Sequence, residues 1–235
     1  MKQIYSKILV LTLLSILGIF SVDAATITHD GINYSVKGNN ATVAYFQRDV
    51  PYAIEGDIVI PSTFVEGGIT YNVTGIGSKA FKGCDKVTKF TFGNGITQVG
   101  ANAFENCTAL KQVILPESCV KFSAKCFYNC TALEVNPLPA KTTTLGQLMF
   151  GGCTALKEAY IPATIAKIPQ TIWAGCTLDK ITFADTDASL NISTKAFGDG
   201  TAPRAGPRTS CSSSRSSSCL CICFHASLST STTTR

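Results

Sequence analysis

The chain of 235 residues contains a repeat with a period of 23 residues. Cysteines recur at this spacing: Cys84, Cys107, Cys130, Cys153 and Cys176. Three residues before each cysteine stands a large aromatic residue: Phe81, Phe104, Phe127, Phe150 and Trp173. A single coil of this length cannot bury its own apolar side, whereas a stacked neighbour can cover it. The repeat therefore predicts a solenoid of stacked coils.

Further apolar columns keep the same register. One column lies upstream of the aromatic residues: Ile76, Val99, Phe122, Leu145 and Ile168. Another lies downstream of the cysteines, with its last member one position early: Val87, Leu110, Leu133, Leu156 and Leu178. A third follows, again with its last member early: Phe92, Leu115, Leu138, Ile161 and Phe183. Five coils are therefore expected, followed by a partial sixth that includes Phe197.

Each coil divides into three pieces. Around Gln112 to Leu115 the side chains alternate, which predicts a strand with Val113 and Leu115 inward and Gln112 and Ile114 outward. A second extended piece runs from residue 96 to residue 99. The third piece, from Ala103 to Leu110, has apolar residues three apart, which predicts a short helical or 3₁₀ turn.

The combined pattern resembles the BspA-like leucine-rich repeats. The residues that carry this resemblance are Ile76-Gly77, Ala80-Phe81, Cys84, Val87 and, one coil on, Leu115-Pro116. It covers residues 76 to 199, and a period of 23 lies within the range of leucine-rich repeats. The resemblance implies a surface or secreted protein of the kind associated with adhesion to host proteins or to other microbes. It implies no catalytic motif.

Residues 1–24 are expected to be a signal peptide, with Lys2 and Lys7 before an apolar run and small residues before Ala25. This predicts a secreted or cell-surface protein with no membrane span after cleavage. Residues 25–74 lack the period and carry strand signals. We expect them to form a small β-rich N-terminal cap, because an open solenoid end would expose apolar side chains. A separate binding module is the alternative.

Residues 75–200 are thus expected to form the leucine-rich-repeat solenoid, and residues 201–235 a low-complexity tail. The tail consists mainly of serine, threonine, arginine and cysteine, and the apolar columns stop. We expect this segment to be disordered, or to result from a shifted reading frame. Its Cys211, Cys219, Cys221, Cys223 and His225 match no common zinc spacing, so no metal site is expected.

The periodic cysteines are expected to be buried free thiols, because neighbours in one solenoid column are poorly placed for disulfides. Charge excludes a basic nucleic-acid surface. Of the 20 basic residues, six lie in the leader or tail, so residues 25–203 carry 14 basic and 14 acidic residues. No nucleophile and base pair and no phosphate-binding loop is found, so neither an enzyme nor a cofactor is expected.

The outward strand positions form the candidate binding surface. One column contains Lys89, Gln112, Val135, Glu158 and Lys180. The next contains Thr91, Ile114, Pro137, Tyr160 and Thr182. Exposed Ile114 and Tyr160 beside mixed charges suit a protein partner, although ordinary solvated strand residues would look the same. A carbohydrate-binding accessory protein is the alternative function, but this surface offers only Tyr160 as an aromatic platform.

Overall fold

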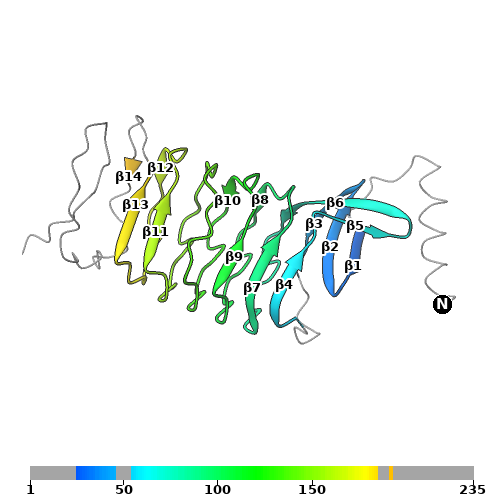
Figure 1. The fold of residues 1–235 in the computed structure, drawn as a ribbon, viewed down its shortest axis with the longest axis horizontal. Helices are drawn as coiled ribbons and strands as arrows, with labels where there is room; N and C mark the ends of the chain where they lie inside the picture. The colour runs from blue at the N-terminus through cyan, green and yellow to red at the C-terminus, as the bar shows by residue number, and fades with distance from the viewer. Residues whose placement is uncertain (1–24, 46–53, 185–190, 193–235) are drawn as a thin grey trace, which may run out of the picture.

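A computed structural model describes residues 25–45, 54–184 and 191–192. The expected signal peptide and the low-complexity tail lie outside these residues. The described chain forms an elongated stack, in which successive coils lie side by side along the long axis (Figure 1). No helix within the described ranges is long and apolar enough to cross a membrane.

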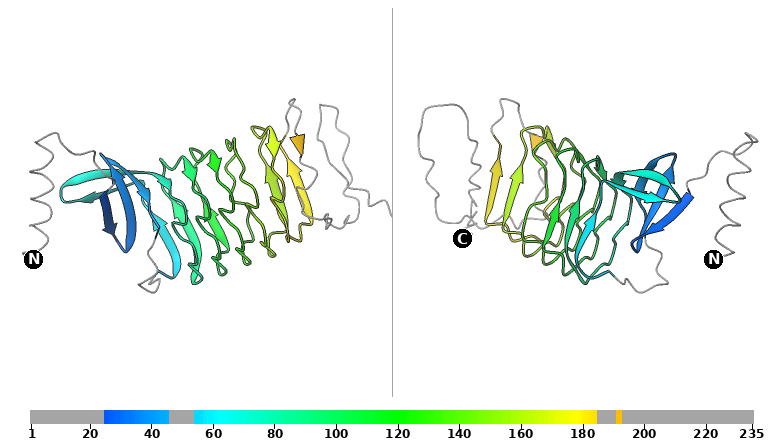
Figure 2. Two further views of the ribbon diagram at one scale, coloured as in Figure 1. Left: turned by 180° about the vertical axis from the view of Figure 1, so that it is seen from behind. Right: turned by 45° about the vertical axis from the view of Figure 1, so that its right-hand side comes forward.

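The first strands form a β-rich N-terminal region. They are β1 (Ala25–His29), β2 (Ile32–Lys37), β3 (Asn40–Val43), β4 (Gly56–Ile60), β5 (Thr63–Glu66) and β6 (Ile69–Ile76). The β1, β2 and β3 strands pair antiparallel, and β5 and β6 form a hairpin. This hairpin projects away from the stack at its N-terminal end (Figures 1 and 2). The β3 strand pairs parallel with β6, which joins this region to the repeats.

The repeats supply the remaining strands. They are β7 (Val87–Phe92), β8 (Gln98–Val99), β9 (Gln112–Ile114), β10 (Lys121–Phe122), β11 (Glu158–Ile161), β12 (Lys167–Ile168), β13 (Lys180–Phe183) and β14 (Asn191–Ile192). On one side of the stack, β4, β7 and β9 form one parallel sheet and β11 and β13 another. On a second side, β6, β8 and β10 are parallel, as are β12 and β14.

The strand pairing follows the repeat. Lys89 pairs with Gln112, and Ile76 pairs with Val99, so partners stand one period apart in sequence. In the last coil Glu158 pairs with Lys180, one position short of the period. This agrees with the early positions of Leu178 and Phe183. The chain therefore folds as the leucine-rich-repeat stack that its sequence predicts.

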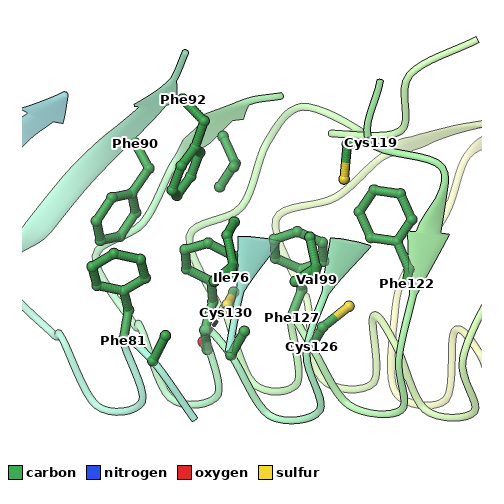
Figure 3. Packing of buried hydrophobic residues seen from close by; sticks show 14 of the residues in the cluster. Ile76, Phe81, Phe90, Phe92, Val99, Cys119, Phe122, Cys126, Phe127 and Cys130 are labelled. Carbon is green, nitrogen blue, oxygen red and sulfur yellow. Dashed lines mark hydrogen bonds between the residues drawn. The ribbon is translucent and has the colours of Figure 1, made fainter. Parts of the chain in front are cut away.

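The aromatic column forms one continuous internal row. The rings of Phe81 and Phe104 stack with their centroids 5.4 Å apart, those of Phe104 and Phe127 at 5.2 Å, and those of Phe127 and Phe150 at 5.7 Å. All four rings are buried. Figure 3 shows Phe81 and Phe127 in this row, with Phe90 packed against Phe81. Because every ring contacts the ring of the next coil, the row ties the stack together.

The third piece of each coil is a series of turns. The helical alternative is therefore wrong, whereas single turns closed by i→i−3 bonds agree with the expected 3₁₀ type. In the Ala103–Leu110 coil, backbone N–H groups alternate between two kinds of partner. The Phe104 N–H donates to the Cys126 carbonyl of the next coil, whereas the Glu105 N–H donates to the Asn102 carbonyl of its own turn. A helix would direct all these bonds within one segment. Repeated turns preserve the spacing of apolar residues while bonding adjacent coils.

This turn geometry requires a left-handed backbone at two positions of each coil. The second of these is occupied only by glycine or asparagine: Gly83, Asn106, Asn129, Gly152 and Gly175, with φ between 59° and 78°. These are the residue types that adopt positive φ at least cost. The first position is less selective: Lys79, Asn102, Lys125, Leu148 and Thr171.

One coil departs from the pattern. The strand expected near Leu138 is absent, and this interrupts the sheet between β9 and β11. Pro137 has no N–H group, so it cannot donate a bond that a parallel ladder needs. Pro139 does not distinguish this coil, because Pro116 and Pro162 occupy the same column after β9 and β11. Pro137 is also buried, which corrects its expected outward position. Pro137 therefore divides one side of the solenoid into two sheets.

Candidate functional site

The strand face consists of the outward side chains of β4, β7, β9, β11 and β13. Strand register aligns these side chains in two rows. The apolar row contains Val59, Thr91, Ile114, Tyr160 and Thr182. The charged row contains Asp57, Lys89, Gln112, Glu158 and Lys180. Side chains two apart on a strand share a face, so the two rows lie next to each other.

The apolar row exposes large side chains to solvent. Val59 is 70% exposed, Ile114 40% and Tyr160 38%, and Val135 beside them is 47% exposed. In the same strands Phe90, Val113 and Ala159 point inward and are buried. The alternation that the sequence predicts therefore holds in β7, β9 and β11. Leu115, expected inward, is only partly buried at the end of its strand.

The charged row is loosely paired. The Lys180 Nζ lies 4.0 Å from the Glu158 Oε2, and both side chains are largely exposed. Asp57 accepts a hydrogen bond of 2.8 Å from the Thr88 hydroxyl. Exposed ion pairs of this kind contribute little to stability because water screens them. Their charges therefore remain accessible to a partner.

The structure separates the candidate residues into two groups. Lys89, Gln112 and Ile114 lie on β7 and β9, with Lys89 and Gln112 partly buried and Ile114 exposed. Glu158, Tyr160 and Lys180 lie on β11 and β13 and are all exposed. The proline-containing coil separates the groups, because its segment after Leu133 forms no strand between β9 and β11.

An open depression of about 440 Å³ lies on the strand face beside the proline-containing coil, and we call it the Tyr160 depression. Its lining comes from three successive coils: Glu134, Val135, Asn136, Lys157, Glu158, Ala159, Tyr160 and Thr182. Two candidate residues, Glu158 and Tyr160, belong to it. The other four do not, so only part of the predicted surface surrounds a recess.

Asn136 holds the two sides of the depression together. Its Nδ2 donates a hydrogen bond of 2.8 Å to the Tyr160 carbonyl, and its Oδ1 accepts one of 3.1 Å from the Leu138 N–H. These side-chain bonds substitute for part of the missing backbone ladder. The Tyr160 backbone is thereby held against the proline-containing coil.

Lys157 is engaged at the edge of the depression. Its Nζ donates to the Thr177 hydroxyl at 2.7 Å and lies 3.4 Å from the Thr154 carbonyl. The ammonium group is therefore held near Thr154 and Thr177. No ion pair involves Glu134 in the described part of the chain. The lining consequently carries two carboxylates, Glu134 and Glu158, and one ammonium group, Lys157, and of the two carboxylates Glu134 is the one without an ion pair.

Sequence analysis did not identify Glu134 and Asn136 as site residues. The recess exists because Pro137 breaks the strand, and a repeat pattern assumes that every coil keeps it. Pro137 within the expected strand was the signal that could have indicated a break. The position of Val135, exposed in the same column as Gln112 and Glu158, agrees with the sequence pattern.

The cysteine column is a structural feature of the core. Each thiol donates to a phenylalanine carbonyl of the preceding coil: Cys107 to Phe81, Cys130 to Phe104, Cys153 to Phe127 and Cys176 to Phe150, at 2.8–3.1 Å. All seven cysteines in the described ranges are free thiols, as predicted. Burial raises the pKa of Cys119 to about 12 and that of Cys176 to about 11. Such thiols are poor nucleophiles, because the thiolate is the reactive form.

Possible metal ligands do not gather in this part of the molecule. Within residues 25–45 and 54–184, no group of three or more histidine, cysteine, aspartate or glutamate side chains could hold a metal ion. The tail cysteines and His225 lie outside the described residues. His29 contacts Glu66 at 3.2 Å and stacks on the Phe64 ring, so it joins β1 to the β5–β6 hairpin.

Comparison with known families supports the repeat assignment. Residues 69–201 match the model of the BspA type leucine rich repeat region, with six copies. This match covers more than half of the chain and begins at the start of β6. Among curated proteins, no significant match was found.

Solved structures show the same architecture. A leucine rich cell surface protein from Faecalibacterium prausnitzii is 26% identical, with a TM-score of 0.64, and the match covers 74% of this chain and 46% of that one. A leucine-rich repeat protein from Bacteroides ovatus is 27% identical, with a TM-score of 0.56, covering 69% and 40%. The chain thus spans less than half the length of either. The T. pallidum leucine rich repeat protein, 15% identical with a TM-score of 0.55 over 77% of this chain and 90% of its own, shares the fold.

Proposed function

Because this chain belongs to the BspA-type leucine-rich repeat family, we propose that it is a secreted or cell-surface protein whose strand face binds other proteins, as an adhesin does. The partners are host matrix proteins or microbial surface proteins. The description of the F. prausnitzii relative as a cell surface protein supports this location. The residues expected to form a signal peptide support export.

The observation that carries the proposal is the apolar row beside the charged row. Val59, Ile114 and Tyr160 are exposed on strands whose opposite sides pack against the core. Protein interfaces commonly combine exposed aromatic or aliphatic anchors with a surrounding polar rim. The register of the strands provides both on one surface.

Protein binding is supported better than carbohydrate binding. Sugar-binding surfaces need several aromatic platforms, and on the described strand face Tyr160 is the exposed aromatic residue. Binding is also supported better than catalysis. Four of the periodic thiols are buried and that of Cys176 is partly buried, and His29 is engaged with Glu66 and Phe64.

A pair of substitutions tests the proposal. The variant Tyr160→Ala combined with Ile114→Ala removes the two anchors of the repeat strands. Both side chains point away from the core, so the fold is expected to persist. Attachment of the purified chain to immobilised matrix proteins and to microbial cells is expected to fall about tenfold or more, as for loss of interface anchors.

Lys121→Ala is the matched control, because Lys121 is exposed on β10, on a different side of the stack. Its attachment is expected to equal that of the unmodified chain. Unchanged attachment by the double variant, with circular dichroism showing an intact fold, would remove the strand face as the binding surface.

A further inference from the structure

We propose that the Tyr160 depression receives an arginine side chain of the partner. This inference rests on the proposed function and specifies the chemistry that the partner presents. It follows from three properties of the depression: an exposed aromatic ring, an aliphatic wall and two carboxylates without a strong internal partner.

The walls of the depression suit a side chain with an apolar stem. Tyr160 and Val135 are both exposed there and come from adjacent coils. The methylene groups of a long basic side chain pack on such surfaces while the charged end remains near solvent. Many side chains with an apolar stem would fit these walls. The charges at the edge of the depression therefore decide which side chain binds.

Those charges favour a cation. Glu134 and Glu158 line the depression. Lys157 also lines the depression, where its ammonium is held by Thr177, and Lys180 pairs with Glu158 at 4.0 Å. A contact at that distance between exposed groups is readily exchanged for a shorter one. A neutral or acidic side chain of the partner would leave Glu134 without an ion pair.

Arginine fits this arrangement better than lysine. A guanidinium is planar, so it can stack on the Tyr160 ring and donate to carboxylates from its edge at the same time. An ammonium group is more strongly hydrated and does not stack. The backbone of Tyr160 is held in place by Asn136, so the aromatic surface is positioned before the partner arrives.

The probe is a short peptide with capped termini whose only charge is its arginine, acetyl-Gly-Ser-Gly-Arg-Gly-Ser-Gly-amide, titrated into the full ¹⁵N-labelled chain. The comparison peptide carries citrulline, which keeps the shape of arginine without its charge. The arginine peptide is expected to shift the amide signals of Val135 and Tyr160 saturably. The citrulline peptide is expected to bind at least about fivefold more weakly, as expected for loss of exposed charge pairs.

Substitutions identify the carboxylates. Glu134→Gln and Glu158→Gln are each expected to weaken arginine-peptide binding about two- to fivefold, and both side chains are exposed, so the fold is retained. Glu117→Gln is the control, since Glu117 is exposed outside the depression, and no change is expected. Equal binding of the citrulline peptide, or glutamine variants that bind like the unmodified chain, would overturn the inference.

The same variants separate this inference from the proposed function. If attachment to matrix proteins or cells is lost on changing Ile114 and Tyr160 while the arginine peptide fails to bind, the strand face binds proteins by another chemistry. If attachment also survives that double change, the proposed function itself fails.

Discussion

Each cysteine from Cys107 onward in the periodic column is both a core side chain and a hydrogen-bond donor. The phenylalanine carbonyl that accepts the thiol also accepts a backbone N–H of its own coil. The Phe104 carbonyl, for example, accepts the Cys130 thiol and the Cys107 backbone N–H. The sequence predicted that these thiols are buried and free, because residues in one column occupy equivalent positions. All five periodic thiols are free, and Cys176 in the last described coil is only partly buried. The sequence could not show the donor role, which depends on backbone carbonyl direction.

The buried thiols make the free energy of unfolding depend on pH in the alkaline range. Burial raises the pKa of Cys119 to about 12 and that of Cys176 to about 11, from an ordinary value of 9.0, and also raises those of Cys126, Cys130 and Cys153. Below pH 9 the thiols are protonated in both states. Above it the unfolded chain loses protons that the folded chain retains, so the free energy of unfolding falls as pH rises.

The expected loss is up to about 1.4 kcal/mol per pH unit for each thiol between about pH 9 and 10. Urea unfolding at several pH values measures it. Cys119→Ala removes one contributing thiol and is expected to reduce the slope by about that amount. A free energy of unfolding that stays constant across this interval would contradict the burial of the thiols.

Thr171 is the residue least compatible with the left-handed backbone conformation that it adopts. Its φ is 55°, and a β-branched residue in the left-handed region is strained. Lys125 occupies the equivalent position two coils earlier, and Asn102 occupies it three coils earlier. Thr171→Asn is expected to raise the free energy of unfolding by about 1 kcal/mol.

Chemical denaturation measures this change, with Thr70→Asn as the control. Thr70 is an exposed residue of β6 without positive φ, so the same substitution there is expected to give no gain. A destabilised Thr171→Asn chain would mean that the threonine side chain contributes more than its backbone strain costs.

At the scale of elements, the repeat pattern predicted the strands that most coils form. It did not predict the turn geometry, the interrupted strand or the length of the first coil. Apolar residues three apart fit a helix and a pair of linked turns equally well, and only the alternating bonds to the next coil distinguish them. The pairing of β4 with β7 was also not predictable from the period. Asp57 and Lys89 are 32 positions apart because the β5–β6 hairpin lengthens that coil.

The proline-containing coil predicts a local weakness in the strand face. The β11 strand pairs with β13 on one side only, whereas β7 pairs with both β4 and β9. Amides of Glu158–Ile161 that face away from β13 lack a ladder of carbonyl partners. We expect them to exchange with deuterium faster than the amides of Val87–Phe92.

Hydrogen exchange followed by NMR measures this difference residue by residue. The amides of β11 that face β13 serve as the internal control, because they have ladder partners and are expected to be protected. Equal protection on both edges of β11 would show that the interruption has no effect on local opening.

At the scale of the whole molecule, the described chain is a stack, and we propose that the strand face along one side is its interaction surface. We propose that residues 25–74 cap its N-terminal end, since the parallel pairing of β3 with β6 covers the edge of the first coil. The outward residues Ile114, Glu158 and Tyr160 were predictable from alternation. The Tyr160 depression was not, because it arises where Pro137 breaks the alternation that the prediction assumes.

The most direct test of the account is a hydrogen-exchange footprint of the chain with a protein that it retains from host extract. The account predicts that binding slows exchange in β9, β11 and β13, around Ile114 and Tyr160, and leaves β8, β10 and β12 unchanged. Protection confined to β8, β10 and β12, or to the β5–β6 hairpin, would contradict the strand face as the binding surface.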